Sequence, residues 1–132
     1  MKPMILAIPL LLASFAFMSA PAAGWASENT QREEAVVEFT ETVRLQGVLL
    51  RGQYLILHDE AKMAAGEPCL YVYTMKSGKR DRLVIALHCE PVAREKAKEF
   101  IVTLTPRNSA YAVREVREIQ FAGFAKAHRI PS

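Results

Sequence analysis

The sequence of 132 residues predicts an all-β fold, a small antiparallel sandwich or barrel of about six strands with one cross-strand disulfide. Two patterns predict this class. Short segments alternate apolar and polar side chains, which is the period of a strand with one buried face. Glycine, proline and clusters of charged residues separate these segments at fairly regular intervals, and stretches with a helical period are few and short.

The N-terminal half of the predicted domain contains two strands. Residues 36–45 alternate between apolar and polar side chains. The apolar face consists of Val37, Phe39, Val43 and Leu45. Gly47 and Gly52 bracket a short turn-like piece, and a second strand follows at residues 54–58.

Residues 69–75 and 83–89 predict a β-hairpin whose turn holds Ser77-Gly78. In a single register, the opposed pairs are Cys69 with Cys89, Tyr71 with Leu87, Tyr73 with Ile85 and Met75 with Leu83. Opposed residues have Cα atoms roughly 4.5–5.5 Å apart, which a disulfide accepts. Since these are the only two cysteines and no Cys-x-x-Cys motif is present, we expect a structural disulfide. A thiolate metal site or a redox pair is the alternative.

The C-terminal part predicts two more strands and little helix. Residues 100–105 alternate cleanly, and the composition of residues 106–109 predicts a turn. Residues 113–121 break the period of two, which suits a bulged strand and a short helix equally well. Residues 61–65 and 92–98 can each form one turn of helix at most.

Residues 1–26 have the layout of a secretory signal peptide. Lys2 precedes an apolar run at residues 4–18, and Gly24-Trp25-Ala26 offers a processing site before Ser27. The competing interpretation is an uncleaved membrane anchor, because no charged residue lies between Lys2 and Glu28. Cleavage places the mature protein in the periplasm or outside the cell, without a stable membrane span and where disulfides persist.

Three segments follow the signal peptide: a polar linker at residues 27–34, the all-β domain at residues 35–125 and a C-terminal tail at residues 126–132. The net charge of +3 gives a weak field, and the basic clusters surround a turn or are interleaved with glutamates. Nucleic acid is therefore not an expected partner. The expected partner is an unidentified protein or small-molecule ligand.

The spacings that common catalytic sites require are missing. The sequence contains no His-Glu-x-x-His, no phosphate-binding glycine loop and no Gly-x-Ser-x-Gly. Cys89 lacks the neighbouring His and Met of a blue-copper site. An enzyme is therefore not expected. A hydrolase or isomerase, with His58 as base and Asp59 or Glu60 to orient it, is the weakest of the hypotheses.

The chain has three histidines, His58, His88 and His128. If they converge at one rim with Asp59, they suit Cu²⁺ or Zn²⁺ with an open coordination position. The alternative is that His88 is a hydrogen-bonded, half-buried residue and that His58 caps the following loop. The spacing does not establish convergence, so both interpretations stay open.

The segment at residues 58–69 is long for a hairpin connection, and long ordered loops often carry binding function. The side chains that it offers to a ligand are Asp59, Glu60, Lys62, Met63 and Glu67. The structural alternative is a turn-rich connection in which Gly66-Glu67-Pro68 steers the chain into the hairpin.

Three motifs give the chain a resemblance to a group of proteins. They are HDEAKMAAGEPC at residues 58–69, HCEP at residues 88–91 and QFAG at residues 120–123. With these motifs the chain resembles, over about residues 45–131, an uncharacterised group of small secreted bacterial proteins that carry HDxxKMxxGEPC, HCxP and QFAG. The resemblance implies an extracytoplasmic location and no particular activity, substrate or cofactor. The sequence departs from the pattern at Glu60 and at Lys126-Ala127-His128, where an acidic residue is expected before the histidine, and this argues against a shared metal role for His128.

The sequence therefore favours a periplasmic or secreted, non-enzymatic accessory or binding protein with no cofactor. The second hypothesis is a small periplasmic protein that binds copper or zinc through its histidines. Convergence of the imidazoles would favour the metal, whereas a concave apolar pocket or a flat apolar face would favour a small ligand or a protein partner.

Overall fold

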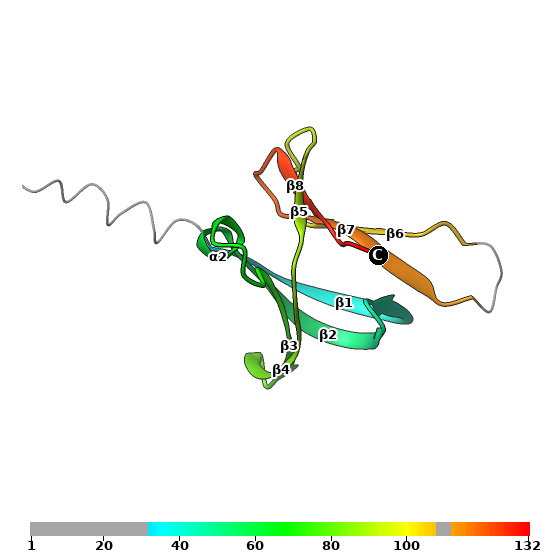
Figure 1. The fold of residues 1–132 in the computed structure, drawn as a ribbon. Coiled ribbons are helices and arrows are strands. Elements are labelled where there is room, and N and C mark those ends of the chain that lie inside the picture. The colour runs from blue at the N-terminus through cyan, green and yellow to red at the C-terminus, as the bar shows by residue number, and fades with distance from the viewer. Residues whose placement is uncertain (1–31, 108–111) are drawn as a thin grey trace, which may run out of the picture.

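The computed structural model describes residues 32–107 and 112–132, and these residues confirm the all-β class (Figure 1). The strands are β1 (Arg32–Leu45), β2 (Val48–Asp59), β3 (Leu70–Lys76), β4 (Lys79–Leu87), β5 (Glu90–Ala93), β6 (Ile101–Leu104), β7 (Arg114–Gln120) and β8 (Lys126–Arg129), and one short helix, α2 (Glu60–Ala64), follows β2. The signal peptide expected at residues 1–26 lies outside the described residues. Within the described ranges, no helix has the length and apolar character needed to cross a membrane.

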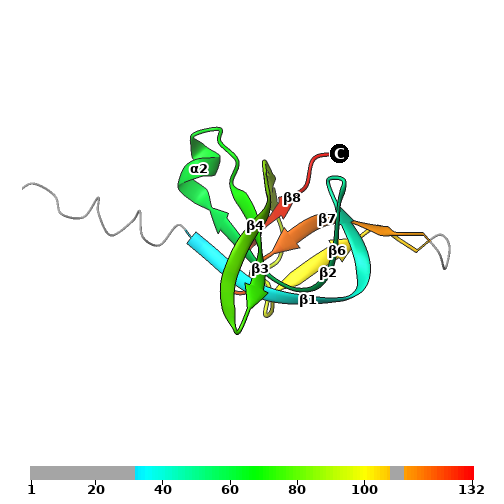
Figure 2. The ribbon, with the colours of Figure 1, turned by 90° about the horizontal axis from the view of Figure 1, so that it is seen from below.

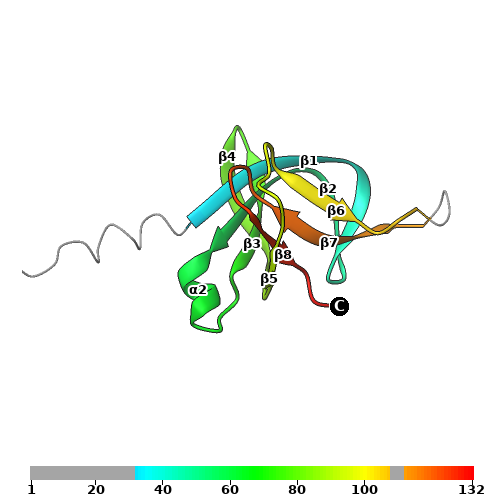
Figure 3. The same cartoon turned by 90° about the horizontal axis from the view of Figure 1, so that it is seen from above.

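The strands form one curled sheet in the order β4-β3-β2-β1-β7-β8-β5, with β6 paired to β7. Strands β4 and β5 stand at the two ends of this order, yet only His88 and Cys89 separate them in the chain. The sheet must therefore curl until its ends approach, and Figure 1 shows β5 continuing from β4 toward β8. Figures 2 and 3 show α2 with the β3–β4 hairpin toward one end of the molecule and the β6–β7 pair toward the other. One contact is parallel, that of β1 with β7 at Val43–Arg114 and Arg44–Glu115.

The β1–β2 hairpin has the inward face that the alternation predicts. Phe39, Val43 and Leu45 are buried. Gln46 and Gly47 have positive φ values of 44° and 84°, which is the geometry of a two-residue hairpin turn. The expected turn-like piece between Gly47 and Gly52 is wrong, because β2 runs through Gly52 and only Gly47 belongs to a turn.

The β3–β4 hairpin has the predicted turn but not the predicted register. Ser77 and Gly78 have φ values of 53° and 75°, as a two-residue turn requires. Leu70 pairs with Leu87, one residue away from the register that would set Cys69 opposite Cys89. Two register shifts interrupt this hairpin, and they change the pairing along its length. The two cysteines instead flank the hairpin, one before β3 and the other after β4.

Several shorter predictions change in the folded chain. The helical turn expected at residues 61–65 is present as α2, whereas residues 92–98 contain the end of β5 and no helix. The ambiguous segment at residues 113–121 is the strand β7, with a register shift against β6. The tail expected at residues 126–132 contains β8, and the turn expected at residues 106–109 lies partly outside the described residues.

The core lies inside the curled sheet and draws on most of its strands. Its buried members are Phe39, Val43, Leu45, Leu50, Ile56, Leu70, Val72, Leu87, Val116, Ile119, Phe121 and Ile130. Phe100 packs beside Phe121 with ring centroids 5.1 Å apart. Burial of these side chains from water is the main stabilising term of the fold, and it fixes the ends of β2 and β8 that carry the polar cluster described next.

Candidate metal centre

Two histidines from distant parts of the chain stack on each other inside the protein. His58 lies near the end of β2, and His128 lies in β8. Both are fully buried, and their ring centroids are 3.7 Å apart with an angle of 27° between the planes. Strand pairing holds His128 from both sides, against Ile119 of β7 and Pro91 of β5. The curl of the sheet thus brings the two imidazoles together.

A glutamate on β1 completes the inner part of this group. Glu33 is the direct cross-strand partner of His58, and the Glu33 residue is only 9% exposed. Its Oε2 lies 3.4 Å from His128 Nε2 and 3.9 Å from His58 Nδ1. Glu33, Val37 and Phe39 share one face of β1, since side chains two apart point the same way. The carboxylate of Glu33 therefore lies on the inward face of β1, at the start of the strand.

The two cysteines meet at the edge of the same group. Cys89 lies between β4 and β5, and one donor atom each from Cys89, His58 and His128 lie within 4.8 Å of one another. The sulfur atoms of Cys89 and Cys69 are 2.7 Å apart, which is close but longer than a disulfide bond of about 2.05 Å. The two cysteines are not opposed partners in the β3–β4 hairpin. Their sulfurs lie close together because Cys69 directly precedes β3 and Cys89 follows β4. The disulfide itself stays a prediction.

An ion pair borders the cluster on its more exposed side. Glu60, the first residue of α2, pairs with Lys126 of β8. The other Glu60 oxygen lies 3.7 Å from His58 Nδ1. The Glu60 and Lys126 side chains are 25% and 36% exposed, whereas both imidazoles are fully buried. Solvent and ions therefore reach the group most directly past this pair.

Asp59, which the sequence analysis includes among the possible metal ligands, instead stabilises the start of α2 and contacts β1. Its Oδ1 accepts a hydrogen bond of 3.2 Å from the backbone N–H of Lys62 and so caps the N-terminus of α2. Arg32 Nε donates to its Oδ2 over 3.3 Å. Both carboxylate oxygens are thus engaged by the helix and by β1.

The polar atoms of the cluster are buried without hydrogen-bond partners. In the part of the chain that the structure describes, all buried side-chain N and O atoms without a partner belong to four residues of the cluster. They are Glu33 Oε2, Glu60 Oε2 and both ring nitrogens of His58 and His128. Buried polar atoms are nearly always satisfied, so a concentration of exceptions indicates a bound ion or water at this place.

Burial also shifts the proton affinities of the group. The pKa of His58 is lowered from 6.5 to about 4, chiefly because burial removes the charged imidazolium from water and also because His128 lies beside it. Burial likewise raises the pKa of the Cys89 thiol above its ordinary value, with the contact to Cys69 acting in the same direction. Without a bound cation, the site therefore favours a neutral imidazole at His58 and a protonated thiol at Cys89.

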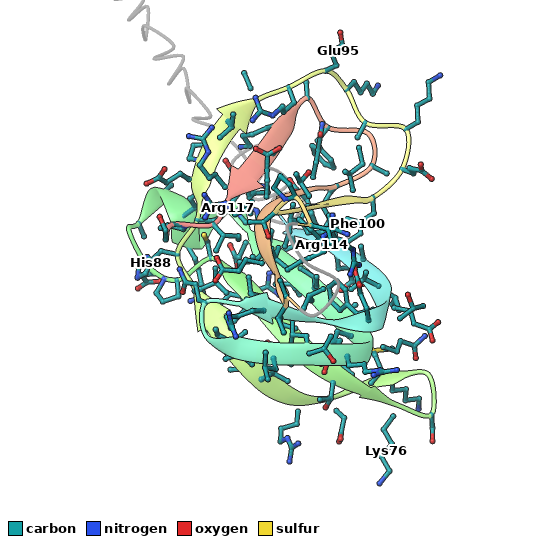
Figure 4. The ribbon with its side chains drawn as sticks, turned by 90° about the vertical axis from the view of Figure 1, so that its right-hand side faces the viewer. Lys76, His88, Glu95, Phe100, Arg114 and Arg117 are labelled. Carbon is teal, nitrogen blue, oxygen red and sulfur yellow. The ribbon has the colours of Figure 1, made fainter. Side chains whose placement is uncertain are left out.

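The remaining predicted site residues do not join this group. His88 is exposed, and Figure 4 shows it at the outer edge of the molecule. In the described residues it belongs neither to the group of His58, Cys89 and His128 nor to that of Glu33, His58 and Glu60. Lys62 and Glu67 lie 3.4 Å apart in a partly exposed ion pair, and Met63 lies partly exposed on α2. The structure therefore brings together two of the three histidines, His58 and His128, and it places Glu60 of the predicted binding loop beside them.

Comparison with known proteins gives no relative from which a role could be transferred. No protein-family model, curated protein or solved structure matches the chain. The resemblance to small secreted bacterial proteins therefore stays a prediction from the motifs, and the chemistry of the site has to be inferred from its own donors and charges.

Proposed function

We propose that this protein is a small exported accessory protein that binds one zinc ion through His58, His128, Cys89 and Glu33. The observation that carries the proposal is the set of buried donor atoms without partners, which gathers around the stacked imidazoles. Buried polar atoms of this kind cost free energy unless something pairs with them. A cation pairs with several of them at once.

The donor types and their spacing support zinc. Imidazole nitrogen, thiolate sulfur and carboxylate oxygen are the three zinc ligands that proteins use, usually four to a tetrahedral ion. Bond lengths of about 2.0–2.3 Å place such ligands roughly 3.3–3.6 Å from one another. Glu33 and His128 are already 3.4 Å apart, and the donor atoms of His58, His128 and Cys89 lie within 4.8 Å. Side-chain rotations that close these gaps by about 1 Å complete the shell.

The charges of the cluster support a divalent ion. Lys126 neutralises Glu60 through their ion pair, while Glu33 has no cationic side chain among its hydrogen-bond or salt-bridge partners in the described residues, other than the histidines. Glu33 and a Cys89 thiolate together carry two negative charges. An ion of charge 2+ balances them, and it also stabilises the thiolate form that burial alone disfavours.

The closure of the site supports a non-enzymatic role. Catalytic zinc keeps an open position for water or substrate, whereas structural zinc has four protein ligands. Here both imidazoles are fully buried, and they lie with Cys89 in one group of donors and beside Glu33, whose Oε2 is 3.4 Å from His128 Nε2. A shell made of these four side chains has no open position. A closed site of this type holds the ends of β1, β2 and β8 together and makes folding depend on the metal.

Export is part of the proposal and is supported by the sequence alone. The apolar run at residues 4–18 and Gly24-Trp25-Ala26 have the arrangement of a cleaved signal peptide. Intact mass of the protein recovered from the periplasm of an expression host gives an N-terminus at Ser27 if this is correct. A mass that retains residues 1–26 supports a membrane anchor instead.

The metal is tested with reduced protein purified without a histidine tag. Zinc titrated against a chromophoric chelator is expected to bind at one ion per chain, and His128→Gln is expected to weaken binding more than about 100-fold. His88→Gln is the matched control, because His88 is exposed, and it leaves the affinity unchanged. Failure of the wild-type protein to take up zinc, or equal losses in both variants, would contradict the proposal. Copper in place of zinc, at one ion per chain, in protein purified from the periplasm without chelators would contradict the choice of zinc. A competitive titration does not decide this, because most sites of this donor type bind Cu²⁺ more tightly than Zn²⁺.

A further inference from the structure

Cys69 has no place in the proposed ligand set, although it touches a member of it. Its sulfur lies 2.7 Å from Cys89 Sγ, and the residue is 1% exposed. Backbone hydrogen bonds fix its position: Cys69 N–H donates to Leu87 C=O over 3.0 Å, and Cys69 C=O accepts from Asp59 N–H over 2.8 Å. The folded chain therefore holds a second thiol beside the one that would bind zinc.

We infer that Cys69 is the redox partner of Cys89, so that a Cys69–Cys89 disulfide and a zinc ion exclude each other at this site. The inference rests on the proposed zinc function. It states that oxidation of the two cysteines regulates zinc binding. It is carried by the contact between the two sulfurs and by the placement of Cys89 within 4.8 Å of both imidazoles. The same sulfur can bond to the metal or to Cys69, but a disulfide sulfur is no longer a thiolate ligand.

The exchange balances with a small-molecule disulfide, such as glutathione disulfide, as oxidant. In the zinc-bound protein, the bond from zinc to Cys89 breaks and the sulfur–sulfur bond to Cys69 forms by way of a mixed disulfide. The two electrons reduce the added disulfide to one thiol and one thiolate, the proton of the thiol comes from Cys69, and Zn²⁺ is released. Cys89, at 8% exposed against 1% for Cys69, is the sulfur that an oxidant reaches first.

Loss of the thiolate removes both a ligand and a negative charge from the cluster. Changes beyond the ligand shell already cost 10–100-fold in metal affinity, so the oxidised protein is expected to bind zinc more than about 100-fold more weakly than the reduced protein. Linkage requires the converse at equilibrium, so saturating zinc should shift the thiol–disulfide equilibrium of the two cysteines toward the thiols by at least about tenfold.

The inference is tested by measuring zinc affinity of the full mature protein before and after oxidation with glutathione disulfide. Intact mass confirms the loss of two hydrogens. Thiol labelling after equilibration in a glutathione redox buffer, with and without zinc, gives the shift of the thiol–disulfide equilibrium. The matched variant is Cys69→Ser, which keeps the proposed ligand and cannot form the bridge. It is expected to bind zinc like the reduced wild type, before and after treatment with the oxidant and removal of any mixed disulfide.

The outcomes separate the two proposals. Equal zinc affinity of reduced and oxidised wild-type protein would overturn the redox inference and leave the zinc function standing. Absence of zinc binding by the reduced wild type would overturn the zinc function, and the inference with it. The comparison of the two wild-type forms decides the question even if Cys69→Ser fails to fold.

Discussion

Acidification should destabilise the metal-free protein over a pH window set by His58. The pKa of this side chain is about 4 in the folded protein, against 6.5 in the unfolded chain. Between these values the unfolded state binds more protons, so the free energy of unfolding falls as the pH falls. The contribution of the neutral imidazole is complete above the unfolded pKa and is lost progressively toward the folded one.

The size of the effect follows from the shift. Each pKa unit corresponds to about 1.36 kcal/mol, and the fall from about pH 7.5 to about pH 5.0 should cost the folded protein roughly 2 kcal/mol. The groups that face His58 are Glu33 from β1, Glu60 from α2, His128 and Lys126 from β8, and Cys89. Glu33 and Glu60 oppose the shift, while burial and His128 dominate it.

Urea unfolding of the reduced protein in the presence of a chelator measures this loss. His58→Gln should remove most of the pH dependence, whereas the exposed His88→Gln should retain it. A free energy of unfolding that is unchanged or higher at the lower pH would refute the reasoning. So would an equal fall in the wild type and in His58→Gln.

Three further predictions concern the fold. Ile56→Ala, at a core position only 1% exposed, should lower the free energy of unfolding by about 2–5 kcal/mol in urea, whereas Leu49→Ala, at a position 56% exposed, should change it by less than about 0.5 kcal/mol. Gly78→Ala should cost about 1–2 kcal/mol, because the φ of 75° in the hairpin turn is unfavourable for a residue with a Cβ; a neutral thermal melt would contradict this. Arg94→Ala, which removes the 2.7 Å ion pair with Glu118, should cost less than about 1 kcal/mol and less still at high salt, and a larger or salt-independent loss would be contrary to a screened surface pair.

The fold class could be predicted because strand formation leaves a local pattern. The alternation of Val37, Phe39, Val43 and Leu45 indicates which side of β1 is buried. The pair Ser77-Gly78 indicates a turn that needs positive φ. Each of these signals depends only on neighbours in the chain. They therefore predict the class and two hairpins without knowledge of the tertiary contacts.

The register and two short strands could not be predicted in this way. Two register shifts between Val72 and Met75 of the β3–β4 hairpin leave Leu70 opposite Leu87, one residue from the predicted register, and the alternation of the sequence gives no sign of them. β8 has the sequence Lys-Ala-His-Arg, with little apolar alternation, and it is a strand because β5 and β7 pair with it from both sides. Backbone pairing between distant segments decides such elements, and local propensity does not.

The candidate metal centre could be predicted only in its residue types. His58 and His128 are seventy residues apart, and their meeting depends on the closure of the sheet. Its composition places Glu33 in the polar linker, although extending the alternation of β1 back from Phe39 through Val37 places it on the inward face. A charged residue on a predicted core face was the signal that could have found it. His88, next to a cysteine, had the stronger local signal and is exposed.

The most direct test of the zinc site is the absorption spectrum of the reduced protein with Co²⁺ in place of zinc. Tetrahedral Co²⁺ bound to a thiolate gives a sulfur-to-metal charge-transfer band together with intense visible bands. The account predicts both at one Co²⁺ per chain, with loss of the charge-transfer band in Cys89→Ser and its retention in Cys69→Ser. A spectrum without that band in the wild type, or one abolished by Cys69→Ser and kept by Cys89→Ser, would contradict the proposed ligands.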